Sequence, residues 1–161
     1  MDAHRGAVVY LPSIEDVREA YEIREALECM AIAKAMPHVT ARLVGELEDV
    51  VLRMDEATDE EVWFGLNREF NYNQYAASKQ PHLRSILMNV RNSASGYMYV
   101  FVSEAHRSGR SRVDHLRMLR ALEKSDVEAA QGVIRRHLGA TLESLLSSGP
   151  ATKAGPTASP R

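Results

Sequence analysis

The sequence predicts an all-α protein, an antiparallel helical bundle, on the strength of three observations. Apolar residues recur at intervals of three and four along successive segments, which is the spacing of one face of an α-helix. No segment shows the period-2 alternation of a half-buried strand. Outside the C-terminal segment the only prolines are Pro12, Pro37 and Pro81, and each stands between two helical patterns. The length of 161 residues suits one domain with a substantial core.

The first two helices have recognisable N-terminal caps. Ser13 and Asp16 have the spacing of a capping box, so the first helix is predicted to begin there and to end near Pro37. Thr40 can cap a second helix with its hydroxyl group. The apolar faces predicted for these two helices are Ile14, Val17, Tyr21, Leu27 and Ala31, then Leu43, Leu47, Val50 and Met54.

The middle of the chain predicts two further helices. The third begins near Thr58 or Asp59, either of which can cap it. The fourth begins around Pro81, because proline is favoured in the first turn of a helix, and it continues to Phe101. Their apolar faces are Trp63, Leu66 and Phe70, then Leu83, Leu87, Val90 and Ala94.

The last two helices follow a charged loop, which the segment HRSGRS (106–111) predicts. Ser125 and Glu128 have the spacing of a second capping box, so the sixth helix is predicted to begin at Ser125 and to continue through Leu145. The apolar faces of the fifth and sixth helices are Val113, Leu116, Leu119 and Leu122, then Val127, Ala130, Ile134, Leu138 and Leu145.

Charge and composition restrict the classes of function. The net charge of −2 and the pI near 6.3 argue against this chain binding nucleic acid or an anionic membrane by general electrostatics. The single cysteine, Cys29, excludes an internal disulfide and a CxxC metal site, and its alanine-rich surroundings predict a buried side chain. No apolar run approaches the roughly 18 residues that span a bilayer, so we expect a cytoplasmic protein.

Six polar side chains stand on the predicted apolar faces and come from five different helices. Buried polar groups cost free energy unless they are hydrogen-bonded, so they either find separate partners or gather in one internal site. A single such residue more often has the first explanation, and the spacing alone leaves both open. The six residues are Arg24, Asn67, Asn71, Arg91, His115 and His137.

Gathered in one site, these side chains would suit a metal ion, a small acid or both. Imidazole binds divalent zinc, nickel, copper or iron well, and an amide oxygen is a weaker ligand. A guanidinium holds a carboxylate through two parallel hydrogen bonds.

Three segments resemble the FCD domain, the C-terminal effector domain of FadR-type GntR transcription regulators. SIEDVREAYEIREALECMAIAKA (13–35) is similar to the opening helix of that domain. NREFNYNQYAASKQPHLRSIL (67–87) resembles its central segment, and DHLRMLRALEKSDVEAAQGVIRRHL (114–138) resembles its last two helices, including both histidines. The resemblance extends from about residue 7 to residue 146. It implies an antiparallel bundle of six or seven helices.

The resemblance also implies a site. Many members of the family bind a divalent metal through an aspartate, a histidine four residues later, and two histidines on the last two helices. Those positions are Asn67, Asn71, His115 and His137 here. The two asparagines remove the negative charge and one imidazole, so a zinc or nickel site would be weakened. The family's cavity arginines correspond to Arg24 and Arg91, which implies that an organic acid binds with or without metal, with Asn67 and Asn71 beside it.

The resemblance implies a ligand-sensing domain rather than an enzyme. Such a domain forms homodimers and controls operator DNA through a separate winged helix-turn-helix domain. A small metal-dependent enzyme using His115 and His137 is the alternative. No carboxylate is predicted beside these histidines to act as general base, since Asp114 is only a sequence neighbour of His115. A purely structural oligomerisation module is a third possibility, although its centre should be apolar.

The predicted domain covers residues 13–147. Residues 1–12 resemble the end of an interdomain linker and are too few for a DNA-binding domain, so the chain is expected to be a fragment of a regulator or a free-standing sensor. Residues 148–161 contain three prolines and no large apolar side chain, which predicts a disordered tail.

Overall fold

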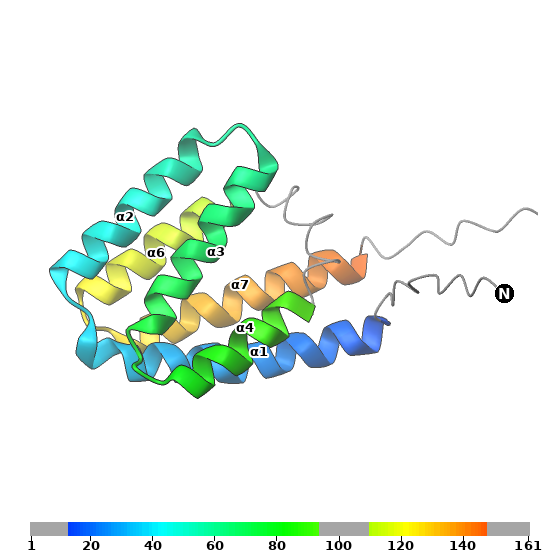
Figure 1. Cartoon of the computed structure of the whole chain (residues 1–161). Coiled ribbons are helices and arrows are strands. Elements are labelled where there is room, and N and C mark those ends of the chain that lie inside the picture. The colour runs from blue at the N-terminus through cyan, green and yellow to red at the C-terminus, as the bar shows by residue number, and fades with distance from the viewer. Residues whose placement is uncertain (1–12, 94–109, 148–161) are drawn as a thin grey trace, which may run out of the picture.

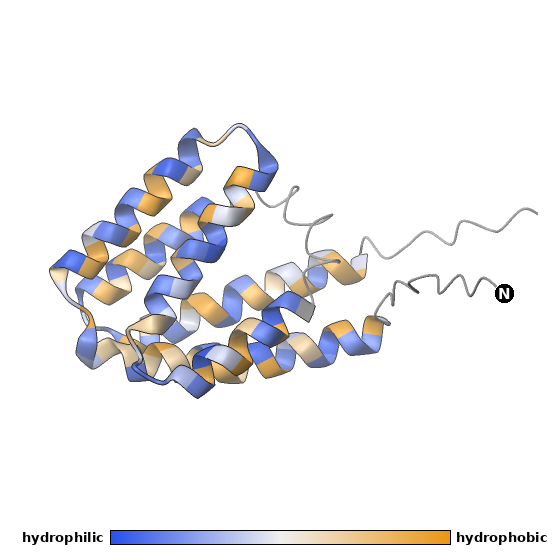
Figure 2. Cartoon of the chain, viewed as in Figure 1, coloured by the Kyte–Doolittle hydropathy of each residue, from blue (hydrophilic) through white to orange (hydrophobic). Residues whose placement is uncertain are grey.

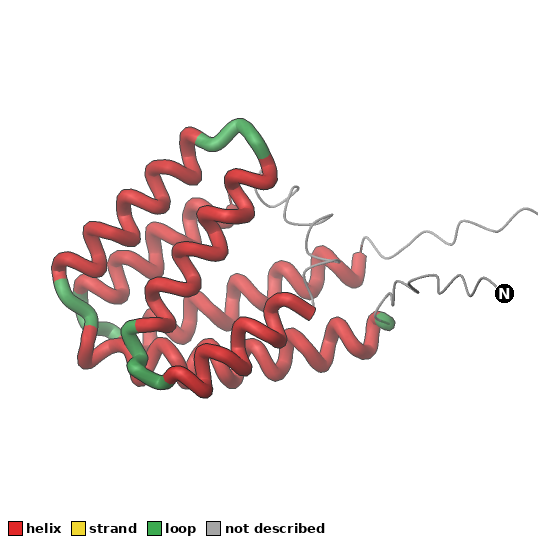
Figure 3. The backbone as a smooth tube through the Cα atoms, viewed as in Figure 1, coloured by secondary structure: helices red, strands yellow, loops and turns green. Residues whose placement is uncertain are grey.

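The computed structural model describes residues 13–93 and 110–147. In these two ranges the chain forms six α-helices, one 3-10 turn and no strand, so the predicted all-α class is confirmed (Figures 1 and 3). None of these helices is long and apolar enough to cross a membrane. The elements are α1 (Ile14–Ala35), η1 (Met36–His38), α2 (Ala41–Glu56), α3 (Glu60–Ala76), α4 (Pro81–Ser93), α6 (Arg110–Glu123) and α7 (Val127–Ser147).

The N-terminal caps of the first three α-helices are as predicted. Ser13 and Asp16 form a reciprocal capping box at the start of α1. The hydroxyl group of Thr40 accepts a hydrogen bond from the backbone of α2, and the carboxylate of Asp59 does the same for α3. Each cap pairs a backbone N–H that the first helical turn leaves without a partner.

The start of α7 differs from the prediction. Ser125 has a φ of 53° and closes the end of α6, where its N–H bonds to Leu122 O and the N–H of Asp126 bonds to Ala121 O. These two bonds form a Schellman motif, which places Ser125 in the left-handed conformation. Asp126 therefore caps α7, with its Oδ1 atom 2.9 Å from the backbone nitrogen of Ala129. The predicted capping box was wrong by one residue.

Other predicted boundaries are tested only in part. α6 begins at Arg110, inside the loop predicted for residues 106–111. The predicted continuation of the fourth helix to Phe101 lies outside the described residues, as do the predicted linker (1–12) and tail (148–161).

Helices from opposite ends of the chain lie side by side. α1 packs along α7 and against α4, while α2 packs against both α3 and α6. Contacts between α6 and α7 and between α1 and α3 join these two groups around one interior (Figure 1). Residues far apart in sequence therefore face the same space.

The interior is mostly apolar. One large cluster takes buried side chains from α1, η1, α2, α3, α6 and α7, and α4 contributes Leu87 to a smaller cluster with Ala31 and Tyr75. Figure 2 shows the alternation of apolar and polar residues along each helix that produces these clusters. Cys29 is buried, as predicted. Ile14 and Val113, predicted on apolar faces, are 41% and 46% exposed, and each lies in the first turn of its helix.

Candidate functional site

The two asparagines of α3 belong to a chain of side-chain hydrogen bonds. The Nδ2 atom of Asn71 donates to the backbone oxygen of Asn67 one helical turn earlier, at 2.6 Å. Gln74 donates from Nε2 to Oδ1 of Asn71 at 3.4 Å. On the other side, Nε2 of His115 lies 3.1 Å from Oδ1 of Asn67. The asparagines thus connect α3 with His115 on α6.

His115 is held in its neutral form. Only 7% of the residue is exposed, and this burial, with the nearby charge of His137, lowers its pKa from 6.5 to about 3. Because the oxygen of Asn67 can only accept, we assign the imidazole proton to the Nε2 atom that faces it. That nitrogen then has no lone pair to offer a metal ion.

His137 on α7 pairs with a carboxylate on α6. Its Nδ1 atom lies 3.1 Å from Oδ2 of Asp114, and Arg117 donates to the other oxygen at 3.3 Å. Burial alone would raise the pKa of Asp114, but the hydrogen bond from His137 and the charges of His137 and Arg117 lower it overall. The expectation that no carboxylate lies beside the predicted histidines is therefore wrong. The carboxylate comes from a different helix: Asp114 lies on α6, and packing of α7 against α6 brings His137 to it.

Glu28 on α1 holds both predicted effector-binding arginines. Its Oε1 atom accepts hydrogen bonds from Nε of Arg24 at 3.0 Å and from Nη1 of Arg91 at 2.8 Å. The hydroxyl group of Tyr75 donates to Oε2 at 2.7 Å. Burial would raise the pKa of Glu28, yet Arg24, Arg91 and Tyr75 together lower it from 4.5 to about 2. Glu28 is thus a buried anion with three partners.

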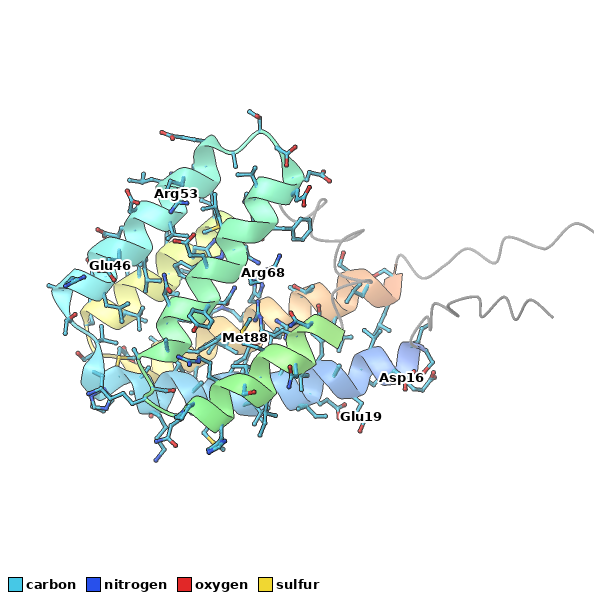
Figure 4. The ribbon with its side chains drawn as sticks, in the orientation of Figure 1. Asp16, Glu19, Glu46, Arg53, Arg68 and Met88 are labelled. Carbon is cyan, nitrogen blue, oxygen red and sulfur yellow. The ribbon has the colours of Figure 1, made fainter. Side chains whose placement is uncertain are left out.

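The burial of Glu28 distinguishes this cluster from the charge pairs on the surface. Glu46, labelled on α2 in Figure 4, pairs with Arg42 at the same i, i+4 spacing, but both side chains are largely exposed. Exposed pairs contribute roughly 0–1 kcal/mol. The side chains of Arg24 and Glu28 are 2% and 4% exposed, so their charges depend on one another.

A polar pocket of about 30 Å³ lies between α1, α3, α6 and α7. This volume, the space open to the centre of a water molecule, would admit roughly two waters. Four of the predicted site residues line it, whereas Arg24 and Arg91 are not among its described lining residues. The residues that line the pocket are Glu28, Asn67, Phe70, Asn71, Gln74, Tyr75, Asp114, His115, Met118, Val133, Ile134 and His137.

Three polar residues that line the pocket were not among the site residues predicted from the sequence. Glu28 could have been suspected from its i, i+4 spacing with Arg24. Gln74 follows Asn71 by three positions on the same face of α3. Gln74 is 2% exposed, and its Oε1 atom has no hydrogen-bond partner among residues 13–93 and 110–147. Asp114, the third, has an i, i+3 partner in Arg117, but no spacing within one helix indicates its hydrogen bond to His137.

The residues present do not fit a tight zinc or nickel site. The four predicted ligands supply two neutral amides and two imidazoles, and the imidazoles are paired with Asn67 and Asp114. Within residues 13–93 and 110–147, no three His, Cys, Asp or Glu side chains gather closely enough to hold a metal ion. Stable sites for these metals need more anionic or imidazole donors.

Comparisons with known proteins agree with this architecture. The FCD domain family matches residues 19–140. Among solved structures, E. coli McbR/YncC matches with a TM-score of 0.74 and 21% identity, over 81% of this chain and 64% of its own length. A GntR-family transcriptional regulator from Pseudomonas syringae pv. tomato str. DC3000 matches with a TM-score of 0.75 and 25% identity, over 91% of this chain and 62% of its own.

A third match, a transcriptional regulator GntR from Rhodococcus sp. RHA1, has a TM-score of 0.74 and 21% identity, over 92% of this chain and 72% of its own. The chain therefore spans less than two thirds of the first two structures. At 21% identity, the first and third matches establish the fold alone. No curated protein matches the sequence.

Proposed function

The chain belongs to the FCD domain family, and from that membership we propose that it senses a small organic effector for a GntR-type transcription regulator. The effector would bind in the pocket between α1, α3, α6 and α7. The observation that carries this proposal is the polar lining of that pocket inside a mostly apolar bundle. Asn67 and Asn71 are its proposed effector-binding residues.

The pocket favours a sensor over a purely structural module. A helical module that only oligomerises gains most stability by filling its centre with apolar side chains. Burying polar groups instead costs free energy that each hydrogen bond only partly offsets. Here amides, imidazoles and carboxylates line the pocket together, and no described residue hydrogen-bonds to Oε1 of Gln74. Such a cost in folding free energy is expected where a bound ligand supplies the missing hydrogen bonds.

Binding of an acid through Arg24 and Arg91 stays a prediction, and it requires Glu28 to move. Both arginines bond to the Glu28 carboxylate. An acid that replaced Glu28 would leave this carboxylate buried and unpaired, and breaking a buried ion pair costs about 3–5 kcal/mol.

An acid that bound beside Glu28 would gain little. At about 4 Å from the Glu28 carboxylate it would be repelled by roughly 4 kcal/mol, taking an effective dielectric constant of about 20. If the acid lay about 7 Å from each guanidinium, Arg24 and Arg91 would return roughly 2 kcal/mol each. These terms cancel, so the cost of removing the acid from water is left without compensation.

The regulator would act as a cytoplasmic homodimer. Effector binding in each pocket would change the relative placement of two winged helix-turn-helix domains on operator DNA, which is a coupling between distinct sites. The matched Pseudomonas syringae protein is a transcriptional regulator of the GntR family. The metal-dependent enzyme using His115 and His137 is disfavoured, because in the described ranges no third His, Cys, Asp or Glu side chain joins them closely enough to hold a metal ion.

Ligand binding to this chain tests the proposal. We would screen a library of small metabolites by thermal shift with the wild type and with Asn71→Leu, using Gln131→Leu as the control. Gln131 on α7 bonds to the backbone of Cys29 and does not line the pocket. A ligand that stabilises the wild type and the control but not Asn71→Leu supports the proposal. Catalytic turnover, or sequence-specific DNA binding by this chain alone at physiological salt, would contradict it.

A further inference from the structure

We infer that the effector is an uncharged, hydroxyl-bearing compound of the polyol or sugar class, and that one of its hydroxyl groups donates to Oε1 of Gln74. This inference rests on the proposed function, because it names the class of ligand for the same pocket. Three features of the pocket carry it: an acceptor without a partner, charges that are already paired, and a lining divided between amides and apolar side chains.

The first feature is the amide of Gln74. Its orientation is set by Asn71, whose Nδ2 atom donates to the Asn67 backbone and whose Oδ1 atom therefore faces Nε2 of Gln74. Oε1 of Gln74 is left as a buried acceptor without a partner in the described part of the chain. A ligand that offers a donor at this position removes the penalty of an unsatisfied buried group.

The second feature is the balance of charge. Glu28 is paired with two arginines, and Asp114 is paired with Arg117 and His137. No lysine or arginine is among the described lining residues. A carboxylate would meet the oxygens of Glu28 and Asp114, while a cation would approach a cluster in which two guanidiniums face one carboxylate. A ligand without charge avoids both penalties and loses less free energy on leaving water than an ion does.

The third feature is the chemistry and shape of the lining. The amides of Asn67, Asn71 and Gln74 present donors and acceptors together, and a hydroxyl group is both at once. Phe70, Val133 and Ile134 supply apolar surface for the C–H groups of such a ligand. The volume of about 30 Å³ admits one hydroxymethyl-sized group. The rest of the ligand would extend towards His137, whose side chain is 36% exposed.

Matched pairs of neutral and acidic compounds test the class of ligand. We would measure binding of erythritol, xylitol and glucose, and of their acid counterparts erythronate, xylonate and gluconate, by ligand-observed NMR at millimolar concentrations. We expect at least one neutral compound to bind at least tenfold more tightly than its acid. Gln74→Met, which keeps the length of the side chain but removes the acceptor, should weaken that binding about tenfold or more. Gln131→Met should leave it unchanged.

The outcomes separate this inference from the proposed function. If only the acids bind, the class of ligand is wrong and an effector-sensing pocket remains. If no neutral compound binds, or if Gln74→Met binds as tightly as the wild type, the inference is also overturned. If Gln74→Met does not fold, the wild type labelled with ¹⁵N supplies the readout. The side-chain amide resonances of Gln74 should then shift on saturation with the neutral ligand, and unchanged resonances would contradict the inference.

Discussion

Arg91 on α4 donates a hydrogen bond of 2.8 Å to the buried carboxylate of Glu28 on α1. The same oxygen of Glu28 accepts from Arg24, so one carboxylate compensates two guanidiniums inside the bundle. This arrangement joins α1 to α4 and stands next to the pocket, because Glu28 is also one of its lining residues. The arginines that were expected to hold an effector therefore have a structural role first.

Removal of the Glu28 carboxylate should destabilise the fold strongly. Glu28→Ala leaves Arg24 and Arg91 buried without their shared partner, and we expect a loss of about 3–5 kcal/mol in the free energy of unfolding. Urea denaturation followed by circular dichroism measures it. Glu46→Ala, which removes a carboxylate from an exposed i, i+4 pair, should cost less than about 1 kcal/mol. Equal effects of the two substitutions would show that the buried cluster is not structural.

The buried carboxylate should also make stability depend on pH. The pKa of Glu28 is lowered from 4.5 to about 2 in the folded protein, so the unfolded state binds the proton first. Its contribution to stability is fully present above pH 4.5 and is lost as the pH falls to about 2, a change of about 3 kcal/mol. We expect the difference in unfolding free energy between the wild type and Glu28→Gln to shrink over this window. A difference that is constant from pH 6 to pH 2.5 would contradict it.

The cap of α7 can be tested by two adjacent substitutions. Asp126 accepts a hydrogen bond from the first turn of α7, so Asp126→Ala should reduce stability by about 1 kcal/mol. Ser125 occupies the left-handed position that ends α6, where glycine is favoured. We expect Ser125→Ala to have a much smaller effect and Ser125→Gly to increase thermal stability slightly. Calorimetry of the three variants measures this, and a larger loss for Ser125→Ala would restore the capping box first predicted from the sequence.

The helices and three of their caps could be predicted because their signals are local. Ser13 and Asp16 are three residues apart, and their reciprocal hydrogen bonds depend only on that spacing. The capping box predicted at Ser125 was wrong because a serine at this position has two possible roles. The same residue can begin one helix or end the previous one, and the short turn after α6 favours the second.

The pocket could be predicted only in part, because periodicity gives the face of a residue and not its partner. His115 and His137 were expected to face the same interior, and both do. The hydrogen bond between His137 and Asp114 joins α7 to α6, and no spacing within one helix indicates it. Glu28 reaches residues 47 and 63 positions away, so the neutralisation of the arginines depends on tertiary packing.

Restoring the residues of the family's metal site provides the last prediction. Asn67→Asp together with Asn71→His places a carboxylate and an imidazole one turn apart on α3, facing His115 and His137 across the pocket. We expect chelator-treated wild type to contain little zinc or nickel by elemental mass spectrometry, because two neutral amides are poor ligands for these ions. The double variant, reloaded with either ion, should approach one metal per chain.

The same measurement on the double variant with His115→Ala and His137→Ala added should return the metal content to the wild-type level, since the carboxylate and the one imidazole left on α3 are too few donors for a stable site. Near-stoichiometric metal in the wild type, lost in His115→Ala/His137→Ala, would instead show that the amides complete a working site. The effector would then bind by coordinating that ion. The hydrogen bond between Asn67 and His115 would have to break when the metal binds.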